Sequence, residues 1–167
     1  VFRPGPVPFT PDERALLQTF AAQAAVAASN ARLFAQVREA KQRLDAILDA
    51  SAEGIAILGP DNRVQRINPA LARLLGASAA AAVGTPHDSL LRFRALRLGR
   101  TLAEAEAGGW PLSHETSLYL EGDLLRADGS AVSAAATYAP VLGPDRALLN
   151  IIAEVRDLTR FREAEEM

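Results

Sequence analysis

The sequence of 167 residues holds only two histidines, His87 and His114. Imidazole nitrogens bind metal ions and transfer protons near neutral pH. A metal-binding motif needs its ligands at short, defined spacings, and these two residues lie too far apart in the sequence to form one. We therefore expect no metal site, and we expect both histidines to lie on the surface or in loops.

Cysteine is absent from the sequence. This absence excludes disulfides, cysteine nucleophiles, thiolate zinc sites, iron–sulfur clusters and the cysteinyl chemistry of flavin photoreceptors. The serines lack the strand-turn-helix Gly-x-Ser-x-Gly setting of a hydrolase nucleophile, and there is no glycine-rich phosphate loop. We expect that this chain is not an enzyme.

One short segment, "RFRALRLGR", is rich in arginine, and its arginines alternate with large apolar residues: Arg92, Arg94, Arg97 and Arg100 stand among Phe93, Leu96 and Leu98. A solvated arginine face with the leucines turned inward is one interpretation. The other is a guanidinium clamp for a carboxylate or phosphate ligand, with Arg92 and Arg94 at the mouth of a pocket. Trp110 has a similar pair of interpretations, as a packing residue or as the wall of a flavin site.

Charge and hydropathy restrict the partners of the chain. The net charge is −2 and Lys41 is the only lysine, so there is no basic surface of the kind that nucleic acids bind. The least charged stretch, 15–31, is too short and too polar to span a bilayer. We expect a cytoplasmic fragment with no membrane contact, cut from inside a longer protein because it starts at Val1 and ends in a new helix.

The amino-terminal third predicts one long helix. Thr10 and Glu13 have capping-box spacing, Pro11 suits the first helical position, and neither proline nor glycine follows until Gly54. A helix from Pro11 to Ala50 would be roughly 60 Å long at 1.5 Å per residue.

Apolar residues recur along this helix in alternating steps of three and four, as in a coiled coil. The first seam comprises Leu17, Phe20, Ala24, Ala27, Ala31 and Phe34, and the second comprises Leu33, Val37, Ala40, Leu44 and Ile47. The two seams differ in phase near Phe34, which predicts a locally unwound or overwound coil. We expect the second seam to form a parallel homodimer; the alternative is a helix that lies on its own domain.

The remainder of the chain predicts a small sheet interrupted by short helices. Asn68 and Gly76 are typical of helix ends around "PALARLL", and Ser78, Thr85 and Thr101 can begin further helices. Strands are expected at 54–58, 63–67, 115–126, 131–142 and 147–157. The expected order is two strands, several short helices and three strands.

A two-residue turn at Asp128-Gly129 would place Tyr119 opposite Tyr138 on one sheet face. The other face would then carry Leu118 and Leu120 together with Ala135, Thr137 and Ala139. We expect both faces to be covered. Small side chains at Ala135, Thr137 and Ala153 predict a modest apolar cavity under the helices, reached past the arginine-rich segment and suited to a small organic acid.

The element order and three stretches of sequence resemble the PAS domain, a sensory fold: "LDAILDASAEGIAILGPDNRVQRINPALARLLG", "LLRADGSAV" and "VRDLTRFREAEE". This resemblance implies an α+β fold with a five-stranded antiparallel sheet and short helices on one face. Asp157-x-Thr159 is similar to the Asp-Ile-Thr exit motif of the family, with leucine in the middle. The resemblance implies that Asp157 and Thr159 relay a signal from the sheet to the outgoing helix.

A second resemblance concerns "PFTPDERALLQTFAAQAAVAASNARLF", which looks like the last helix of a GAF domain, another sensor module. The domain organisation is then expected as a GAF-like helix at 1–35, a helical linker at 36–50, a PAS domain at 51–157 and an outgoing helix at 158–167.

The resemblances imply a sensory and dimerisation module of a bacterial two-component protein. In the resembling proteins the output domain is commonly a histidine kinase, a cyclic-dinucleotide enzyme or a transcription activator, and we expect a histidine kinase here. A ligand-free spacer is the main alternative, and a PAS domain with loosely bound flavin or haem is another. Haem-binding relatives use a histidine on the helix that here spans 102–107, which has none, and light sensors use an Asn-Cys-Arg-Phe motif that is missing. We therefore expect no coloured cofactor.

Overall fold

The computed structural model describes residues 5, 8–111, 117–159 and 161. The chain divides into two compact units, Val1–Ala46 and Ile47–Met167, and each is described by itself. None of the described helices combines the length and hydrophobicity that crossing a membrane would require.

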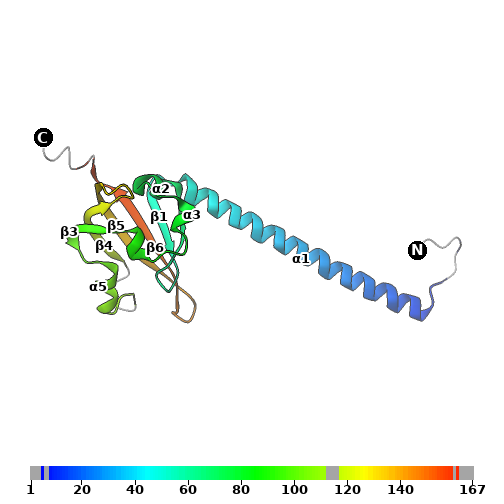
Figure 1. Cartoon of the computed structure of the whole chain (residues 1–167). Helices are drawn as coiled ribbons and strands as arrows, with labels where there is room; N and C mark the ends of the chain where they lie inside the picture. The colour runs from blue at the N-terminus through cyan, green and yellow to red at the C-terminus, as the bar shows by residue number, and fades with distance from the viewer. Residues whose placement is uncertain (1–4, 6–7, 112–116, 160, 162–167) are drawn as a thin grey trace. The chain divides into compact units, whose positions relative to one another are not determined.

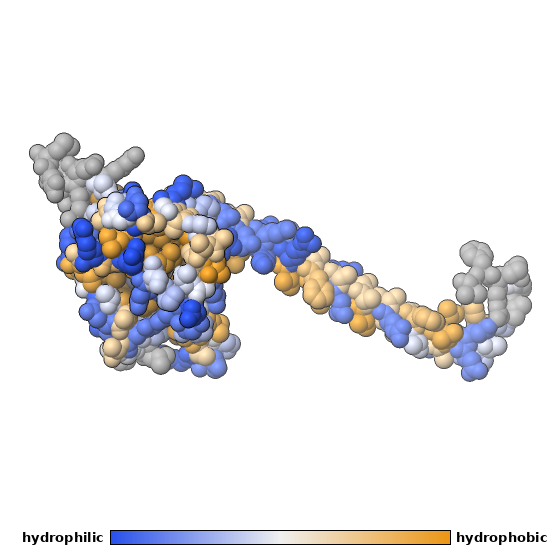
Figure 2. Space-filling model, in the orientation of Figure 1, coloured by the Kyte–Doolittle hydropathy of each residue, from blue (hydrophilic) through white to orange (hydrophobic). Residues whose placement is uncertain are grey.

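The long helix α1 spans Pro11–Ala50, as the sequence predicts. Its start is a capping box: the backbone N–H of Glu13 donates to the Thr10 hydroxyl at 3.2 Å, and the backbone N–H of Thr10 donates to the Glu13 carboxylate at 2.9 Å. No residue of α1 is buried. Figure 2 shows apolar side chains, in orange, as a broken stripe along this helix.

The second unit is built on an antiparallel sheet of six strands in the order β2-β1-β6-β5-β4-β3 (Figure 1). The strands are β1 (Gly54–Leu58), β2 (Val64–Ile67), β3 (Phe93–Gly99), β4 (Leu118–Leu125), β5 (Ala131–Leu142) and β6 (Leu148–Asp157). The expected α+β fold with an antiparallel sheet is confirmed, with six strands in place of five.

The additional strand is β3, which lies in the arginine-rich segment. We expected only short helices there. Two irregularities in its pairing with β4, between Phe93 and Ala95 and between Leu96 and Leu98, break the alternation that marks a strand in sequence. β3 approaches β4 closely at Gly122, where an added Cβ atom would lie 2.2 Å from the carbonyl oxygen of Ala95. The sheet therefore gains an edge strand at a position where β4 has no side chain.

Among the residues that the structure describes, the second unit also contains the short helices α2 (Pro69–Leu75), α3 (Ala79–Ala82), α4 (His87–Leu90) and α5 (Leu102–Ala107). The predicted starts of α2 and α5 are confirmed, because a side chain caps each of them. The Asn68 side chain accepts the backbone N–H of Leu71, and Thr101 forms a capping box with Glu104. These caps set where the chain leaves the sheet and returns to it.

The predicted register of the β4–β5 hairpin is wrong by one residue. The backbone N–H of Arg126 donates to the carbonyl oxygen of Ser130, so the turn contains three residues and not two. Gly129 adopts a φ of 84°, and the Asp128 carboxylate accepts the backbone N–H of Ser130 at 2.9 Å. A three-residue turn that ends in a left-handed glycine is a standard hairpin connection.

The corrected register separates the two tyrosines. Tyr138 pairs with Leu118, and Tyr119 pairs with Thr137. Since side chains alternate along a strand, Tyr119 and Tyr138 lie on opposite faces of the sheet. Tyr138 is 1% exposed in the core, whereas Tyr119 is 43% exposed. The core face of the three long strands comprises Leu118, Leu120, Leu124, Val132, Ala134, Ala136, Tyr138, Ile151, Ala153 and Val155.

Candidate ligand and relay sites

His87 is buried, so the expectation of a surface histidine is wrong at this position. It is the first residue of α4 and is only 5% exposed. Its Nε2 atom lies 2.7 Å from the Tyr138 hydroxyl, and the two rings meet edge to face with centroids 5.3 Å apart. The short helix turns the imidazole inward because the core-facing Tyr138 offers it a polar partner. His114 lies outside the described residues.

The partners of His87 assign its tautomer. Nδ1 lies 2.9 Å from Oδ1 of Asp88. An ionised carboxylate can only accept a hydrogen bond, so Nδ1 carries the proton of the neutral ring and Nε2 accepts the Tyr138 hydroxyl proton. Burial, and to a smaller extent the negative charge of Asp88, raises the pKa of Tyr138 above its ordinary value. Tyr138 therefore remains a neutral hydroxyl over the physiological pH range.

A cavity of about 260 Å³ opens beside this pair, and we call it the His87 cavity. Its lining residues come from α4, the segment around β3, the start of α5, and strands β4 and β5: His87, Asp88, Leu91, Arg92, Phe93, Thr101, Leu102, Leu120 and Tyr138. The leucines and Phe93 form its apolar walls. Such a combination of apolar walls and a few polar groups is typical of small-molecule sites.

The arginines of the arginine-rich segment lie at different sites and do not form one cluster. Arg92 lines the His87 cavity, and Arg94 is exposed on β3. Arg97 forms an ion pair with Asp123 and donates to the Ser133 hydroxyl at 2.7 Å. Arg92 is the arginine of this segment that we place at a cavity.

The remaining predicted pocket residues lie in different parts of the sheet. Trp110 is 3% exposed within the core cluster, and Ala153 is fully buried on the core face of β6. Ala135 and Thr137 pair with Glu121 and Tyr119, and so they lie on the opposite sheet face from Ala153. The structure therefore does not bring Ala135, Thr137 and Ala153 together at one cavity.

Asp157 and Thr159 meet at the exit of the sheet. β6 ends at Asp157, and Oδ1 of Asp157 accepts the backbone N–H of Thr159 at 2.8 Å. Between them, the backbone N–H of Leu158 donates to the carbonyl oxygen of Ser133 on β5, at 2.8 Å. These bonds fasten the first residues after β6 to the end of the sheet.

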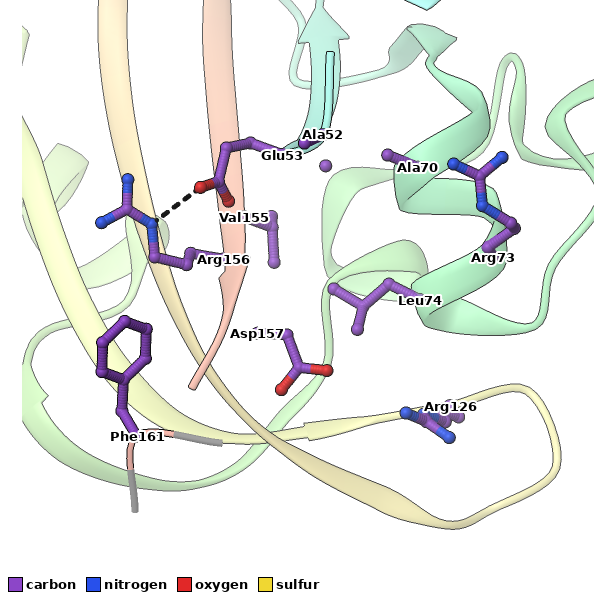
Figure 3. Close-up of a pocket in the computed structure, with 11 residues that line it drawn as sticks. Ala52, Glu53, Ala70, Arg73, Leu74, Arg126, Val155, Arg156, Asp157 and Phe161 are labelled. Carbon is purple, nitrogen blue, oxygen red and sulfur yellow. Dashed lines mark hydrogen bonds and ion pairs between the residues drawn. The ribbon is translucent and has the colours of Figure 1, made fainter. Parts of the chain in front are cut away.

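A groove of about 550 Å³ surrounds this exit (Figure 3). Figure 3 shows the Asp157 carboxylate pointing toward the side of the groove that carries Leu74 and Arg126, while Phe161 lies on the other side. Glu53 and Arg156 form an ion pair at 3.0 Å across the start of β1 and the end of β6. Arg126 has a buried Nε atom without a hydrogen-bond partner among the described residues. The exit motif thus lies in a polar groove.

The His87–Tyr138 pair was missed at the sequence level. The only local signal was "TPHD", which we interpreted as a helix start. The inward position of His87 depends on a contact with a residue 51 positions away. Among the described residues, no group of three or more acidic, histidine or cysteine side chains could hold a metal ion.

Comparison with known proteins identifies the fold of the second unit. A family model described as the PAS fold matches residues 48–163. The PAS domain of an HTR-like protein from Haloarcula marismortui is 22% identical with a TM-score of 0.57, and the alignment covers 75% of this chain and 98% of that one. The PAS domain of nitrogen regulation protein NR(II) from Vibrio parahaemolyticus is 23% identical with a TM-score of 0.52, covering 68% and 95%.

An RNA-binding light-oxygen-voltage receptor is 20% identical with a TM-score of 0.60. The match covers 75% of this chain but only 35% of the receptor, so the chain spans about a third of that protein. No curated protein sequence matches the chain.

Proposed function

Because the chain belongs to the PAS fold family, we propose that it is a sensory and dimerisation module that relays a signal to a downstream output domain, with a histidine kinase as the expected output. The module acts by binding and by conformational relay, without catalysis. The observation that carries the proposal is the connection of a central strand, β6, to the Asp157–Thr159 exit.

β6 connects the cavity side of the sheet with the exit. Tyr138, which lines the His87 cavity, pairs with Ala153 on β6, and the same ladder ends with Ala134 paired to Asp157. A displacement of Tyr138 therefore acts on the strand that carries the exit cap. Since the cap is a single hydrogen bond from Thr159, a small shift of β6 changes the start of the outgoing segment.

Dimerisation supplies the second half of the proposal. The seam of Leu33, Val37, Ala40, Leu44 and Ile47 is exposed in the single chain, with Val37 67% exposed and Ile47 62% exposed. Heptad spacing over this length is typical of a parallel coiled coil. In the proposed arrangement a GAF-like domain precedes α1 and the output domain follows residue 167, both in cis.

The relay is tested by replacing Asp157 with alanine in the full-length protein. We expect the activity of the output domain in Asp157→Ala to shift toward that of the isolated output domain, because the cap no longer holds the outgoing segment. The matched control is Asp145→Ala, since Asp145 accepts the backbone N–H of Ala147 at 3.1 Å by the same local geometry in the β5–β6 turn.

Both substitutions remove one capping bond, worth about 1 kcal/mol. Similar losses of stability with a changed output only in Asp157→Ala support the relay. If Asp157→Ala lowers stability and leaves the output at the wild-type level, the residue is only a cap and the relay is wrong.

A further inference from the structure

The heptad phase of the second seam continues through the amino-terminal half of α1. In a heptad lettered a to g, positions a and d face the partner helix. Leu33, Ala40 and Ile47 hold d positions, and Val37 and Leu44 hold a positions. Counting back from Leu33 in the same steps of three and four gives the further a and d residues Asn30, Val26, Gln23, Thr19 and Leu16. One uninterrupted seam therefore extends from Leu16 to Ile47, about 45 Å at 1.5 Å per residue.

The first seam cannot continue in the same way toward the carboxyl end of α1. Its next a and d positions after Phe34 are Arg38, Lys41 and Asp45, and all three are charged. Burial of such charges between two helices would be costly. In the continuous phase of the second seam, Phe20 and Phe34 hold e positions, which border the a and d residues. This phase requires no distorted coil near Phe34.

Three polar side chains interrupt the continuous seam. The Thr19 hydroxyl donates to the carbonyl oxygen of Ala15 at 2.9 Å, so its donor is satisfied within its own helix. The side-chain amides of Gln23 and Asn30 form no hydrogen bond within the described part of the chain, and both residues are exposed on α1. A helix that covers the seam must supply partners for these two amides, because a buried amide without a hydrogen bond is destabilising.

A parallel pair of helices in register brings each amide to a like amide. Asn30 then meets Asn30 of the second copy, and Gln23 meets Gln23 of the second copy. A carboxamide can both donate and accept, so each of these pairs can form a hydrogen bond across the seam. A shift of one helix by one heptad places Gln23 against Leu16 of the second copy, which offers no partner.

Antiparallel pairs leave the amides without such partners, because a positions then face d positions of the second copy. In the antiparallel register with the greatest overlap, Asn30 faces Leu33 and Gln23 faces Ala40. The antiparallel register that brings Asn30 to the hydroxyl of Thr19 leaves the carboxyl-terminal end of the seam, from Ala40 onward, uncovered. The two amides therefore favour the parallel pair in register.

We propose that Asn30, supported by Gln23, fixes the orientation and register of the α1 pair, and that the partner is a second copy of this chain, parallel and without stagger. The inference rests on the dimerisation in the proposed function and names the residues that determine its geometry. A single polar residue at an a position lowers the stability of a coiled coil while it specifies register and oligomeric state. The pair is twofold symmetric, and both copies of α1 end at the same level.

The absence of cysteine allows orientation to be measured with single engineered cysteines in the 167-residue chain. Val26→Cys and Val37→Cys chains are mixed in equal amounts in a glutathione redox buffer. Facing Cα atoms of two helices with axes about 10 Å apart are about 5 to 6 Å apart, within disulfide range. Positions 26 and 37 of one helix are about 16 Å apart, beyond that range.

The two orientations give different products. The parallel pair in register forms disulfides only between like chains. The antiparallel pair with the greatest overlap forms the mixed disulfide, because Val26 faces Val37 of the second copy in that register. We expect disulfides between like chains to exceed the mixed disulfide at least about tenfold.

Asn30→Leu, added to both cysteine chains, tests the role of the amide. It should lower the excess of like-chain disulfides at least about threefold and strengthen the dimer, because an apolar layer fits either orientation. Adding Gln23→Leu should lower the excess further. Gln42→Leu is the matched control: it makes the same kind of change at an exposed f position and should leave both quantities unchanged.

Two results would overturn the inference while the dimer stands. One is a mixed disulfide as abundant as the disulfides between like chains, and the other is an excess that Asn30→Leu leaves unchanged. A wild-type chain that is monomeric by light scattering would instead contradict the dimerisation in the proposed function, so the two failures are distinguishable. The Asp157 experiment measures output and tests the relay separately.

Discussion

The side-chain amide of Asn68 donates a hydrogen bond to the carbonyl oxygen of Leu48, in the last turn of α1, at 3.1 Å. The same amide donates to the carbonyl oxygen of Glu53 at 2.9 Å. Its Oδ1 atom accepts the backbone N–H groups of Ile55 at 2.8 Å and Leu71 at 3.0 Å. One side chain, 1% exposed, thus connects the end of α1, the start of β1 and the start of α2.

Asn68→Ala should destabilise the chain by about 2 kcal/mol or more, because it leaves two backbone donors and two carbonyl oxygens without their partner. Asn150→Ala is the control. Its amide also donates two hydrogen bonds, to Leu58 and Gln65, but the site is only partly buried, and we expect a loss below about 1 kcal/mol. Urea unfolding measures both, and equal losses would contradict the role of Asn68 as the buried connection.

The proposed coiled-coil dimer leads us to expect that two substitutions on the same turn of α1 differ in their effect on the mass of the protein. Leu44→Asp places a charge in the seam of each helix and should cost several kcal/mol, enough to dissociate a modest interface. Ala46→Asp is exposed and outside the seam, so it should leave the dimer intact. Light scattering gives the mass of each variant. A wild-type chain that is monomeric at tens of micromolar would rule out the coiled-coil dimer.

Gly122→Ala should weaken the pairing of the edge strand β3 with β4. The new Cβ atom would lie 2.2 Å from the carbonyl oxygen of Ala95, so β3 must move away from β4. We expect a loss of about 2 kcal/mol or more and faster hydrogen exchange in β3. Gly76→Ala is the comparison, since a Cβ there meets nothing within 4 Å and only the left-handed backbone opposes it, at about 1 kcal/mol. Unchanged exchange in β3 of Gly122→Ala would argue against this tight contact.

The buried hydroxyl of Tyr138 should make the free energy of unfolding depend on pH in the alkaline range. Burial raises its pKa, so the folded chain keeps the hydroxyl proton while the unfolded chain releases it above about pH 10. The unfolded state binds fewer protons in this range, and stability therefore falls as pH rises from about 10. In Tyr138→Phe the free energy of unfolding should fall less steeply over the same range. Identical slopes in urea titrations of the two proteins would show that Tyr138 does not contribute.

Local patterns in the sequence were sufficient to predict most of the helices and strands. The capping residues Thr10, Asn68 and Thr101 mark helix starts because the hydrogen bonds that they form reach only a few residues along the chain. The spacing of apolar residues distinguished α1 from the strands, because this spacing too is set by neighbours a few residues apart in the chain. The hydrogen bond between Asp157 and Thr159 is also local, and the resemblance to the exit motif of the PAS family had pointed to these two residues.

Contacts between distant segments of the chain determined the hairpin register, the additional strand β3 and the burial of His87. The hairpin register depended on a third turn residue, and an error of one position placed Tyr138 with Tyr119 on one face. β3 is a strand because Gly122 leaves room for it on β4, and the broken alternation of its own residues does not reveal that partner. His87 is buried because α4 brings it to Tyr138, and burial of a polar side chain is determined by the partner that it finds in the folded core.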